Sequence, residues 1–195
     1  MASDSNEYIT LVSGLPRSGT SMMMRMLEAG GLPILTDALR EADENNPNGY
    51  YEFERVKALR EGDLEWLDQA RGKVIKVISF LLQDLPPAYS YRVIFMKREM
   101  QEILNSQRKM LEQRGQPADP ARDRELATVF QKHLKQVETW LAHQPNIQTI
   151  YVSYNDLLKT PQADISRLHG FLGVELDEMR MVGTIDKQLY RQRAS

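Results

Sequence analysis

The sequence predicts an α/β fold of three layers, α/β/α, in which helices cover both faces of a central parallel sheet of roughly four to five strands. Short segments rich in β-branched residues are the candidate strands, and they lie at Ile9–Ser13, Val74–Ile78, Val93–Met96 and Ile147–Val152. Helical patterns separate these segments, as expected for βαβ units. The length of 195 residues suits one domain with a substantial core.

Four helices are expected, and each has a recognisable boundary. They span about 20–28, 100–114, 120–141 and 161–172. Gly30 and Gly31 end the first helix, and Gly115 ends the second. Asp119 before Pro120 is a cap and first turn for the third, which carries an apolar stripe at helical spacing.

The composition is that of an ordinary globular protein, with 42% hydrophobic and 27% charged residues. A net charge of −2 gives no indication of nucleic-acid binding. The absence of cysteine excludes disulfides, thiolate metal sites and cysteine nucleophiles. Residues 1–7 are polar and lack a positive flank or a long apolar run, so we expect no signal peptide, no membrane span and a cytoplasmic location.

We expect a single domain over residues 1–195, with residues 1–7 disordered and residues 183–195 forming a basic tail. No internal repeat and no low-complexity segment divides the chain.

The first strand leads into a candidate anion-binding loop. Gly14-Leu15-Pro16 breaks the strand, and helix-forming residues begin at Thr20. In such a loop the backbone N–H groups point inward, and the helix N-terminus adds about half a positive charge. The sequence therefore predicts an anion over Ser18 to Ser21.

The residues of this loop restrict which anion it holds. Gly14 and Gly19 have the spacing of the nucleotide-hydrolysing P-loop, but Thr20 stands where that motif has its lysine. A triphosphate would lose its main cationic clamp, whereas backbone amides, hydroxyls and Arg17 can hold one phosphate or sulfuryl group. The alternative is an ordinary strand-to-helix turn in which Arg17 is solvated.

Basic residues also follow or lie within the second and third strands. Lys76 is a charge inside an apolar run, so it either extends to solvent or faces an anionic site. Arg98 follows the third strand, and Ser106 comes eight residues later on the next helix. Ligands of such sheets bind beyond the carboxyl ends of the strands. Two anion sites at that edge indicate a diphosphorylated nucleotide.

Several of these segments resemble the sulfotransferases that use 3′-phosphoadenosine 5′-phosphosulfate (PAPS). The loop at residues 15–21, Leu-Pro-Arg-Ser-Gly-Thr-Ser, is similar to their 5′-phosphosulfate loop in the arginine form common among carbohydrate sulfotransferases. Arg98 and Ser106 match the spacing of the arginine and serine that hold the 3′-phosphate in that family. Residues 151–174 resemble its C-terminal pattern, and residues 46–52 resemble a segment that many members place beside the acceptor.

The resemblance implies a P-loop-like architecture and transfer of a sulfuryl group from PAPS to a hydroxyl or amine of a small-molecule or glycan acceptor, without a metal. It implies catalytic roles for Arg17 as the cation and Lys76 at the acceptor or the sulfuryl oxygens. The cofactor-binding residues that it implies are Pro16, Arg17, Ser18, Gly19, Thr20, Ser21, Arg98 and Ser106.

The chain departs from the cytosolic members of that family at several positions. Their histidine base, two residues after a strand lysine, is Ile78 here, and their adenine-stacking tryptophan is Met22. Their aspartate-proline after the 3′-phosphate arginine is Glu99-Met100. Their glycine-rich C-terminal loop is missing, which leaves Arg191 and Arg193 as candidate replacements.

Glu52 is the candidate general base, because it follows a Pro-Asn-Gly turn and lies between two aromatic residues. The alternative is an acidic N-terminal residue of a helix that carries Val56 and Leu59. The three histidines, His133, His143 and His169, are expected to be structural.

Two other classes of protein fit the same fold. A nucleotide or metabolite kinase would share the sheet and the loop, but it would normally need the missing loop lysine and an acid that holds magnesium. A catalytically silent sulfotransferase-like binding protein is the other alternative, because the histidine and the C-terminal loop are absent.

Overall fold

A computed structural model describes residues 8–37, 39, 49–113, 115–116 and 119–185. Within these residues the chain forms one parallel sheet with the strand order β2-β1-β3-β4. The strands are β1 (Tyr8–Gly14), β2 (Val74–Lys76), β3 (Ser90–Lys97) and β4 (Ile147–Ser153). The predicted α/β class with a central parallel sheet is confirmed, and the described part of the sheet has four strands.

The first strand of the chain occupies the interior of the sheet. Leu11 pairs with Ile75 on one side and with Val93 on the other, and all seven residues of β1 are buried. A strand that is covered on both faces reads as a continuous apolar run, which is why Ile9–Ser13 could be recognised from sequence.

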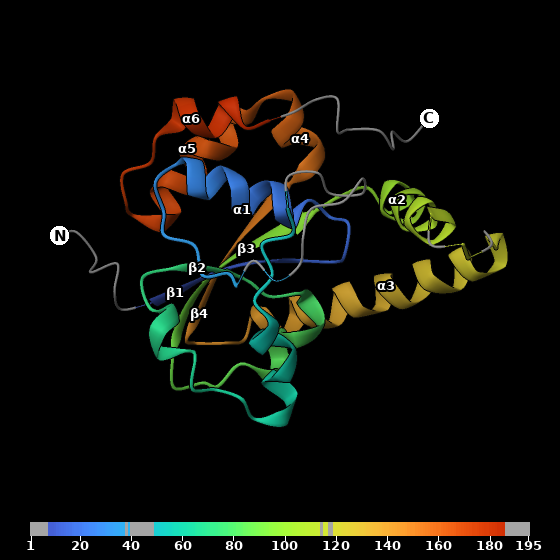
Figure 1. Ribbon diagram of the computed structural model, residues 1–195, viewed down its shortest axis with the longest axis horizontal. Helices are drawn as coiled ribbons and strands as arrows, with labels where there is room; N and C mark the ends of the chain where they lie inside the picture. Colours follow the sequence, from blue (N-terminus) through green and yellow to red (C-terminus); the bar gives the residue numbers. More distant parts are fainter. Residues whose placement is uncertain (1–7, 38, 40–48, 114, 117–118, 186–195) are drawn as a thin grey trace.

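Helices cover the two faces of the sheet in separate layers (Figure 1). One layer contains α1 (Thr20–Ala29), α4 (Tyr154–Lys159), α5 (Pro161–Leu172) and α6 (Glu178–Gly183). The other contains α3 (Pro120–Leu141) and the 3₁₀ helices η2 (Glu54–Glu61), η3 (Asp68–Ala70) and η4 (Ser79–Asp84). Helix α2 (Met100–Gln113) extends past the carboxyl edge of the sheet.

Each layer has its own hydrophobic core. Val12 and Ile94 pack on one side with Met23, Leu27 and Ile165. On the other side, Leu11, Phe95 and Val137 pack with Trp66. Alternate residues of the strands therefore enter opposite cores, as the period of two in a strand requires.

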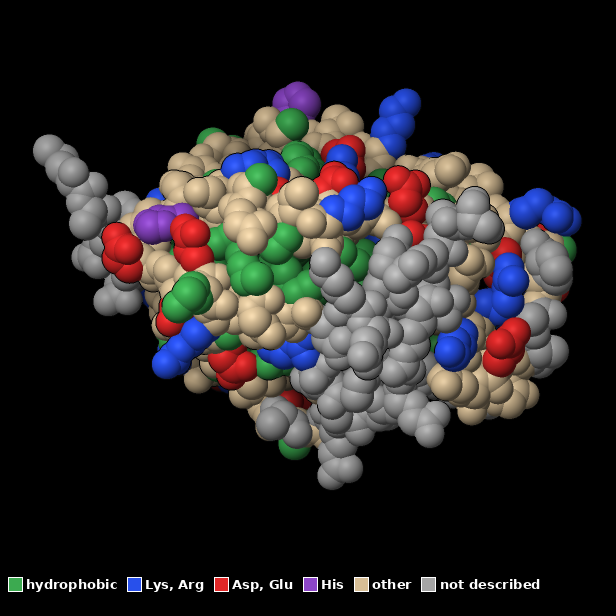
Figure 2. All heavy atoms as spheres, turned by 90° about the horizontal axis from the view of Figure 1, so that it is seen from above, with side chains coloured by type: hydrophobic (Ala, Val, Ile, Leu, Met, Phe, Trp, Pro, Cys, Tyr) green, Lys and Arg blue, Asp and Glu red, His purple; other side chains and the backbone are tan. Residues whose placement is uncertain are grey.

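The face above α1 and α4–α6 is shown in Figure 2, where hydrophobic side chains gather near the centre and charged side chains lie mostly around them. Among the described residues, no helix has both the length and the apolar composition needed to cross a bilayer.

The structure contains elements that the sequence analysis did not predict, namely α4, α6, η3 and η4, and it contains as η2 the helix that the alternative for Glu52 had named. The bounds of η2 change the interpretation of Glu52. Helix η2, which carries Val56 and Leu59, begins at Glu54. Glu52 therefore precedes both that helix and its N-cap residue, Phe53, and the alternative that made it an N-terminal residue of the helix is wrong.

Candidate active site

The loop between β1 and α1 is a tight turn followed by a left-handed glycine. Within it, Ser18 N–H donates to the carbonyl of Leu15 at 3.1 Å, with Pro16 and Arg17 at the two central positions. Arg17 has φ of 70°, the sign that a type II turn requires at its third residue. Gly19 has φ of 100° and leads directly into α1. The loop therefore has the left-handed backbone positions that an inward-facing row of N–H groups needs.

Glycine is required at positions 14 and 19 because of the backbone conformation and because a Cβ atom there would clash with neighbouring residues. A Cβ at Gly14 would lie 2.5 Å from Ser18 Oγ and 2.7 Å from the Met96 carbonyl oxygen. A Cβ at Gly19 would lie 2.4 Å from Cδ2 of Tyr154. The neighbouring strand and α4 thus approach the loop so closely that only glycine fits.

Ser18 has an unsatisfied hydroxyl in this loop. The residue is only 1% exposed, and among the described residues its Oγ has no hydrogen-bond partner. A buried hydroxyl without a partner costs free energy, and an anion held in the loop would supply the missing acceptor. This feature fits the phosphosulfate-binding role expected of Ser18.

The structure brings Arg17, Arg98 and Ser106 together. Nε of Arg17 donates to Oγ of Ser106 at 2.9 Å. An Nη atom of Arg98 donates to the carbonyl oxygen of Arg17 at 3.1 Å. The loop, the end of β3 and α2 are therefore in direct contact at the carboxyl edge of the sheet.

Arg98 also belongs to a buried network that the sequence analysis missed. Its Nε donates to Glu102 at 2.9 Å, and the two side chains are only 8% and 1% exposed. Its guanidinium lies 4.3 Å from the centre of the Tyr154 ring. Asn155 donates to the other oxygen of Glu102 at 3.0 Å. The available signal was the i,i+4 spacing of Arg98 and Glu102 at the start of a helix.

Lys76 lies beside the start of α1. Its Nζ donates to Oγ of Ser21 at 3.1 Å and to the carbonyl of Tyr50 at 2.8 Å. These contacts keep the ammonium group of Lys76 at the start of α1. Lys76 also holds the segment that contains Tyr50 against the loop.

The backbone of Glu52 is hydrogen-bonded to Thr36 and Asp37. Its carbonyl oxygen accepts from the Thr36 hydroxyl at 2.8 Å and from Asp37 N–H at 3.4 Å. Its carboxylate is 22% exposed and lies 3.9 Å from Nζ of Lys57.

Some predicted positions lie outside the described residues. They are 46–48 of the acceptor-like segment, Arg191, Arg193, residues 1–7 and most of the expected basic tail.

His133 is half-buried and satisfied, as expected for a structural histidine. Its Nε2 lies 2.9 Å from Oγ of Ser79, and its ring stacks on Phe80 with centroids 3.8 Å apart. Burial lowers the pKa of His133, so the imidazole is neutral at pH 7.

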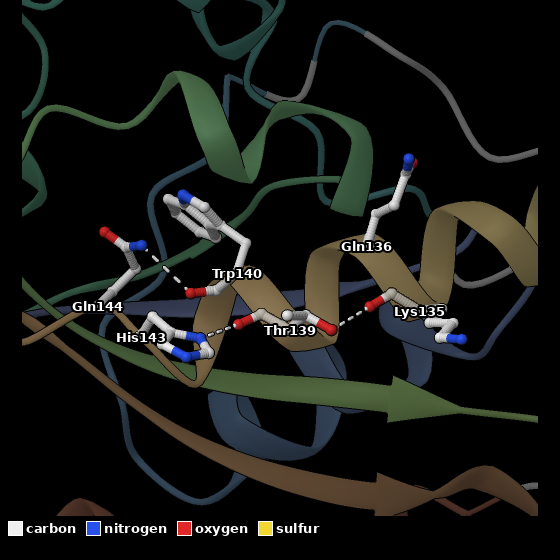
Figure 3. A pocket seen from close by; sticks show the side chains of 6 residues that line it. All are labelled: Lys135, Gln136, Thr139, Trp140, His143 and Gln144. Carbon is white, nitrogen blue, oxygen red and sulfur yellow. Dashed lines mark hydrogen bonds between the residues drawn. The ribbon is translucent and has the colours of Figure 1, made fainter.

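No group of three or more His, Asp or Glu side chains in the described part of the chain has a geometry that could hold a metal ion. A shallow hollow lies along the C-terminal half of α3 and the turn after it (Figure 3). It is lined by Lys135, Gln136, Thr139, Trp140, His143 and Gln144. Several of the polar side chains there bond to carbonyls of the same segment, and none of the predicted site residues lines the hollow.

The sheet and its loop define an α/β protein of P-loop-like architecture. The sequence model of a family described as "Sulfotransferase family" matches residues 51–178, which is more than half of the chain. The chain therefore belongs to the sulfotransferase family.

Solved structures with a similar course of the chain include two sulfotransferases and a kinase. A sulfotransferase domain from the curacin biosynthetic pathway is 18% identical, with 96% of this chain and 78% of that chain covered and a TM-score of 0.48. A sulfotransferase from Alicyclobacillus acidocaldarius is 14% identical, with 93% and 87% covered and a TM-score of 0.48. A sugar kinase from Janibacter sp. HTCC2649 is 16% identical, with 89% and 97% covered and a TM-score of 0.43. A search of curated proteins gives no match.

Proposed function

We propose that this sulfotransferase moves a sulfuryl group from PAPS to a hydroxyl or amine of a small-molecule or glycan acceptor and releases adenosine 3′,5′-bisphosphate. The observation that carries the proposal is the meeting of Arg17, Arg98 and Ser106 at a glycine-bounded loop before a helix. One nucleotide with anionic groups at both its 5′ and 3′ ends would use all three side chains.

The loop residues hold the 5′ end of the donor in this proposal. Backbone N–H groups at the start of α1 and the hydroxyls of Ser18, Thr20 and Ser21 surround the anion, and the helix dipole favours negative charge there. Pro16 and Gly19 set the shape of the turn.

Arg17 is proposed as the catalytic cation. During transfer a bond forms between the acceptor atom and sulfur while the bond from sulfur to the bridging oxygen breaks. Negative charge develops on that bridging oxygen, so a nearby guanidinium stabilises the transition state more than the ground state. Lys76, which contacts Ser21, is proposed to hold sulfuryl oxygens or the acceptor.

Glu52 is proposed to take the proton that the acceptor hydroxyl or amine loses. Arg98 and Ser106 are proposed to hold the 3′-phosphate, since a guanidinium forms strong, charge-assisted hydrogen bonds to phosphate oxygens.

A kinase would need a cation in this loop to bind the γ-phosphate of ATP. Thr20 stands at the position where the P-loop motif has its lysine, so the γ-phosphate of ATP would lack its cation. This substitution supports a sulfuryl donor over a triphosphate.

Isothermal titration calorimetry with and without Mg²⁺ tests the proposed donor. We expect adenosine 3′,5′-bisphosphate to bind equally well with Mg²⁺ and with EDTA, and ATP to bind far more weakly in both. Binding of ATP that depends on Mg²⁺, together with no binding of the bisphosphate, would favour the kinase.

Release of adenosine 3′,5′-bisphosphate from PAPS, measured with panels of phenols, amines and sugars, then tests turnover. A protein that binds the bisphosphate but transfers nothing to any panel would be a silent binding protein.

A further inference from the structure

The carboxylate of Glu102 is the most deeply buried acid in the described part of the site. It is 1% exposed and accepts hydrogen bonds on both oxygens, from Arg98 Nε at 2.9 Å and from Asn155 Nδ2 at 3.0 Å. We propose that Glu102 and Asn155 are positioning residues that fix the Arg98 guanidinium, which in turn holds the backbone of the anion-binding loop at Arg17.

Glu102 determines the orientation of the Arg98 guanidinium. A guanidinium is planar, so a carboxylate on Nε fixes the directions of the other N–H groups. With Nε on Glu102, an Nη atom of Arg98 donates to the Arg17 carbonyl at 3.1 Å, and the plane lies over the Tyr154 ring. Glu102 therefore selects which edge of Arg98 faces the loop.

The anion-binding loop has an unusual backbone conformation at Arg17. Arg17 has φ of 70°, a conformation that non-glycine residues adopt rarely and keep only where their surroundings hold them. Arg98 holds Arg17 at its carbonyl oxygen, and Ser106 holds it at its side chain. Glu102 and Ser106 are four residues apart on α2, so one face of that helix supports both contacts.

The side-chain amide of Asn155 accepts one hydrogen bond and donates another. Its Oδ1 accepts from Glu99 N–H at 3.3 Å, while its Nδ2 donates to Glu102. These two contacts connect the start of α4 to the start of α2. They also mean that an aspartate at position 155 would place a second carboxylate against Glu102.

The charge of Glu102 and its positioning role have opposite effects on anion binding. A carboxylate near an anion site repels the ligand, so a purely electrostatic role predicts tighter binding after Glu102→Gln. A positioning role predicts weaker binding, because glutamine no longer holds both Arg98 and Asn155 in their present orientations. The sign of the change separates the two roles.

Amide hydrogen exchange of the loop tests the proposal without a ligand. We expect Ser18 N–H, which bonds to Leu15, to exchange about tenfold faster in Glu102→Gln, where two side-chain amides meet. We expect a similar rise in Asn155→Asp, where two carboxylates meet.

The double variant Glu102→Gln/Asn155→Asp exchanges the carboxylate and the amide and offers a donor and an acceptor for each of the three hydrogen bonds described above. Its glutamine oxygen accepts from Arg98, its glutamine NH₂ donates to Asp at position 155, and the new carboxylate accepts from Glu99 N–H. We expect loop exchange within about twofold of wild type. If Glu102→Gln does not fold, the comparison of Asn155→Asp with the double variant decides the same point.

Asp164→Asn is the matched control, because Asp164 is also a buried acid in an ion pair, with Arg167 on α5. We expect it to leave loop exchange unchanged. The proposal is overturned if loop exchange in the single variants matches wild type, if exchange rises equally in all segments, or if the double variant does not recover.

A second arm rests on the proposed function and measures the affinity for adenosine 3′,5′-bisphosphate by calorimetry. We expect Glu102→Gln to weaken binding about tenfold and the double variant to restore it. Tighter binding in Glu102→Gln would overturn the positioning role. If the wild-type protein does not bind the bisphosphate, the proposed donor is wrong, while loop exchange still decides the role of Glu102.

Discussion

The Arg98 guanidinium donates to Glu102 through Nε and to the Arg17 carbonyl through an Nη atom. Its proposed ligand is the 3′-phosphate. We expect Arg98→Ala to weaken adenosine 3′,5′-bisphosphate more than adenosine 5′-monophosphate, because only the former has the 3′ group. The excess loss should be about tenfold or more, or roughly 1.4 kcal/mol, as for a charge-assisted contact. Calorimetry with both nucleotides measures it.

Arg98→Lys is the control for that experiment. It keeps a positive charge beside the buried Glu102 and so avoids an unpaired buried charge. Equal losses for the two nucleotides in Arg98→Ala would remove Arg98 from the 3′-phosphate site and leave it only as a support for the loop.

Glu52 has a neighbouring acid that serves as a matched control. Both Glu52 and Glu54 lie near Nζ of Lys57, at 3.9 Å and 2.6 Å. If Glu52 accepts the acceptor proton, Glu52→Gln should lower kcat about 10²-fold or more with nucleotide affinity retained, and Glu54→Gln should leave kcat unchanged. A wild-type kcat in Glu52→Gln would exclude it as the base.

Helix α4 packs so closely against the anion-binding loop that position 19 has no space for a side chain. Gly19 and Gly31 have nearly the same φ, 100° and 99°, but only a Cβ at Gly19 would meet another residue, Tyr154. We expect Gly31→Ala to cost about 1 kcal/mol of unfolding free energy through backbone strain, and Gly19→Ala to cost about 2 kcal/mol more.

Urea denaturation of both variants measures that difference. Equal losses of stability in Gly19→Ala and Gly31→Ala would mean that Tyr154 yields to the new methyl group. Gly19→Ala should also weaken adenosine 3′,5′-bisphosphate, since the loop must move away from α4 to make room.

The elements that sequence analysis identified are those with strong local signals. Gly30 and the Asp119–Pro120 pair lie where the predicted helix boundaries are found, and β-branched runs marked all four strands. Helix α4 has only six residues, too short for a hydrophobic period to be read. The contact of Glu102 with Asn155 joins positions far apart in the chain, so no local pattern could predict it.

The strand order of the whole sheet explains why the candidate site lies at the carboxyl ends of β1 and β3. The chain goes from β1 to β2 on one side, while β3 lies on the other side of β1. A crevice forms at such a reversal of strand order, and ligands bind there in open α/β sheets. The loop after β1 and Arg98 after β3 flank that reversal, and Lys76 ends the strand on the other side of β1.

The central place of β1 also has a consequence for how the protein is made. This strand leaves the ribosome first, but β3, which pairs with all seven of its residues, ends roughly 80 residues later. At about 5–20 residues per second, the interval is roughly 4–16 s. During most of that time, until β2 is complete at Lys76, Ile9, Leu11 and Val12, all completely buried in the finished sheet, have neither partner strand. The nascent chain therefore exposes this apolar strand for seconds, and chaperone binding to the strand would protect it from aggregation.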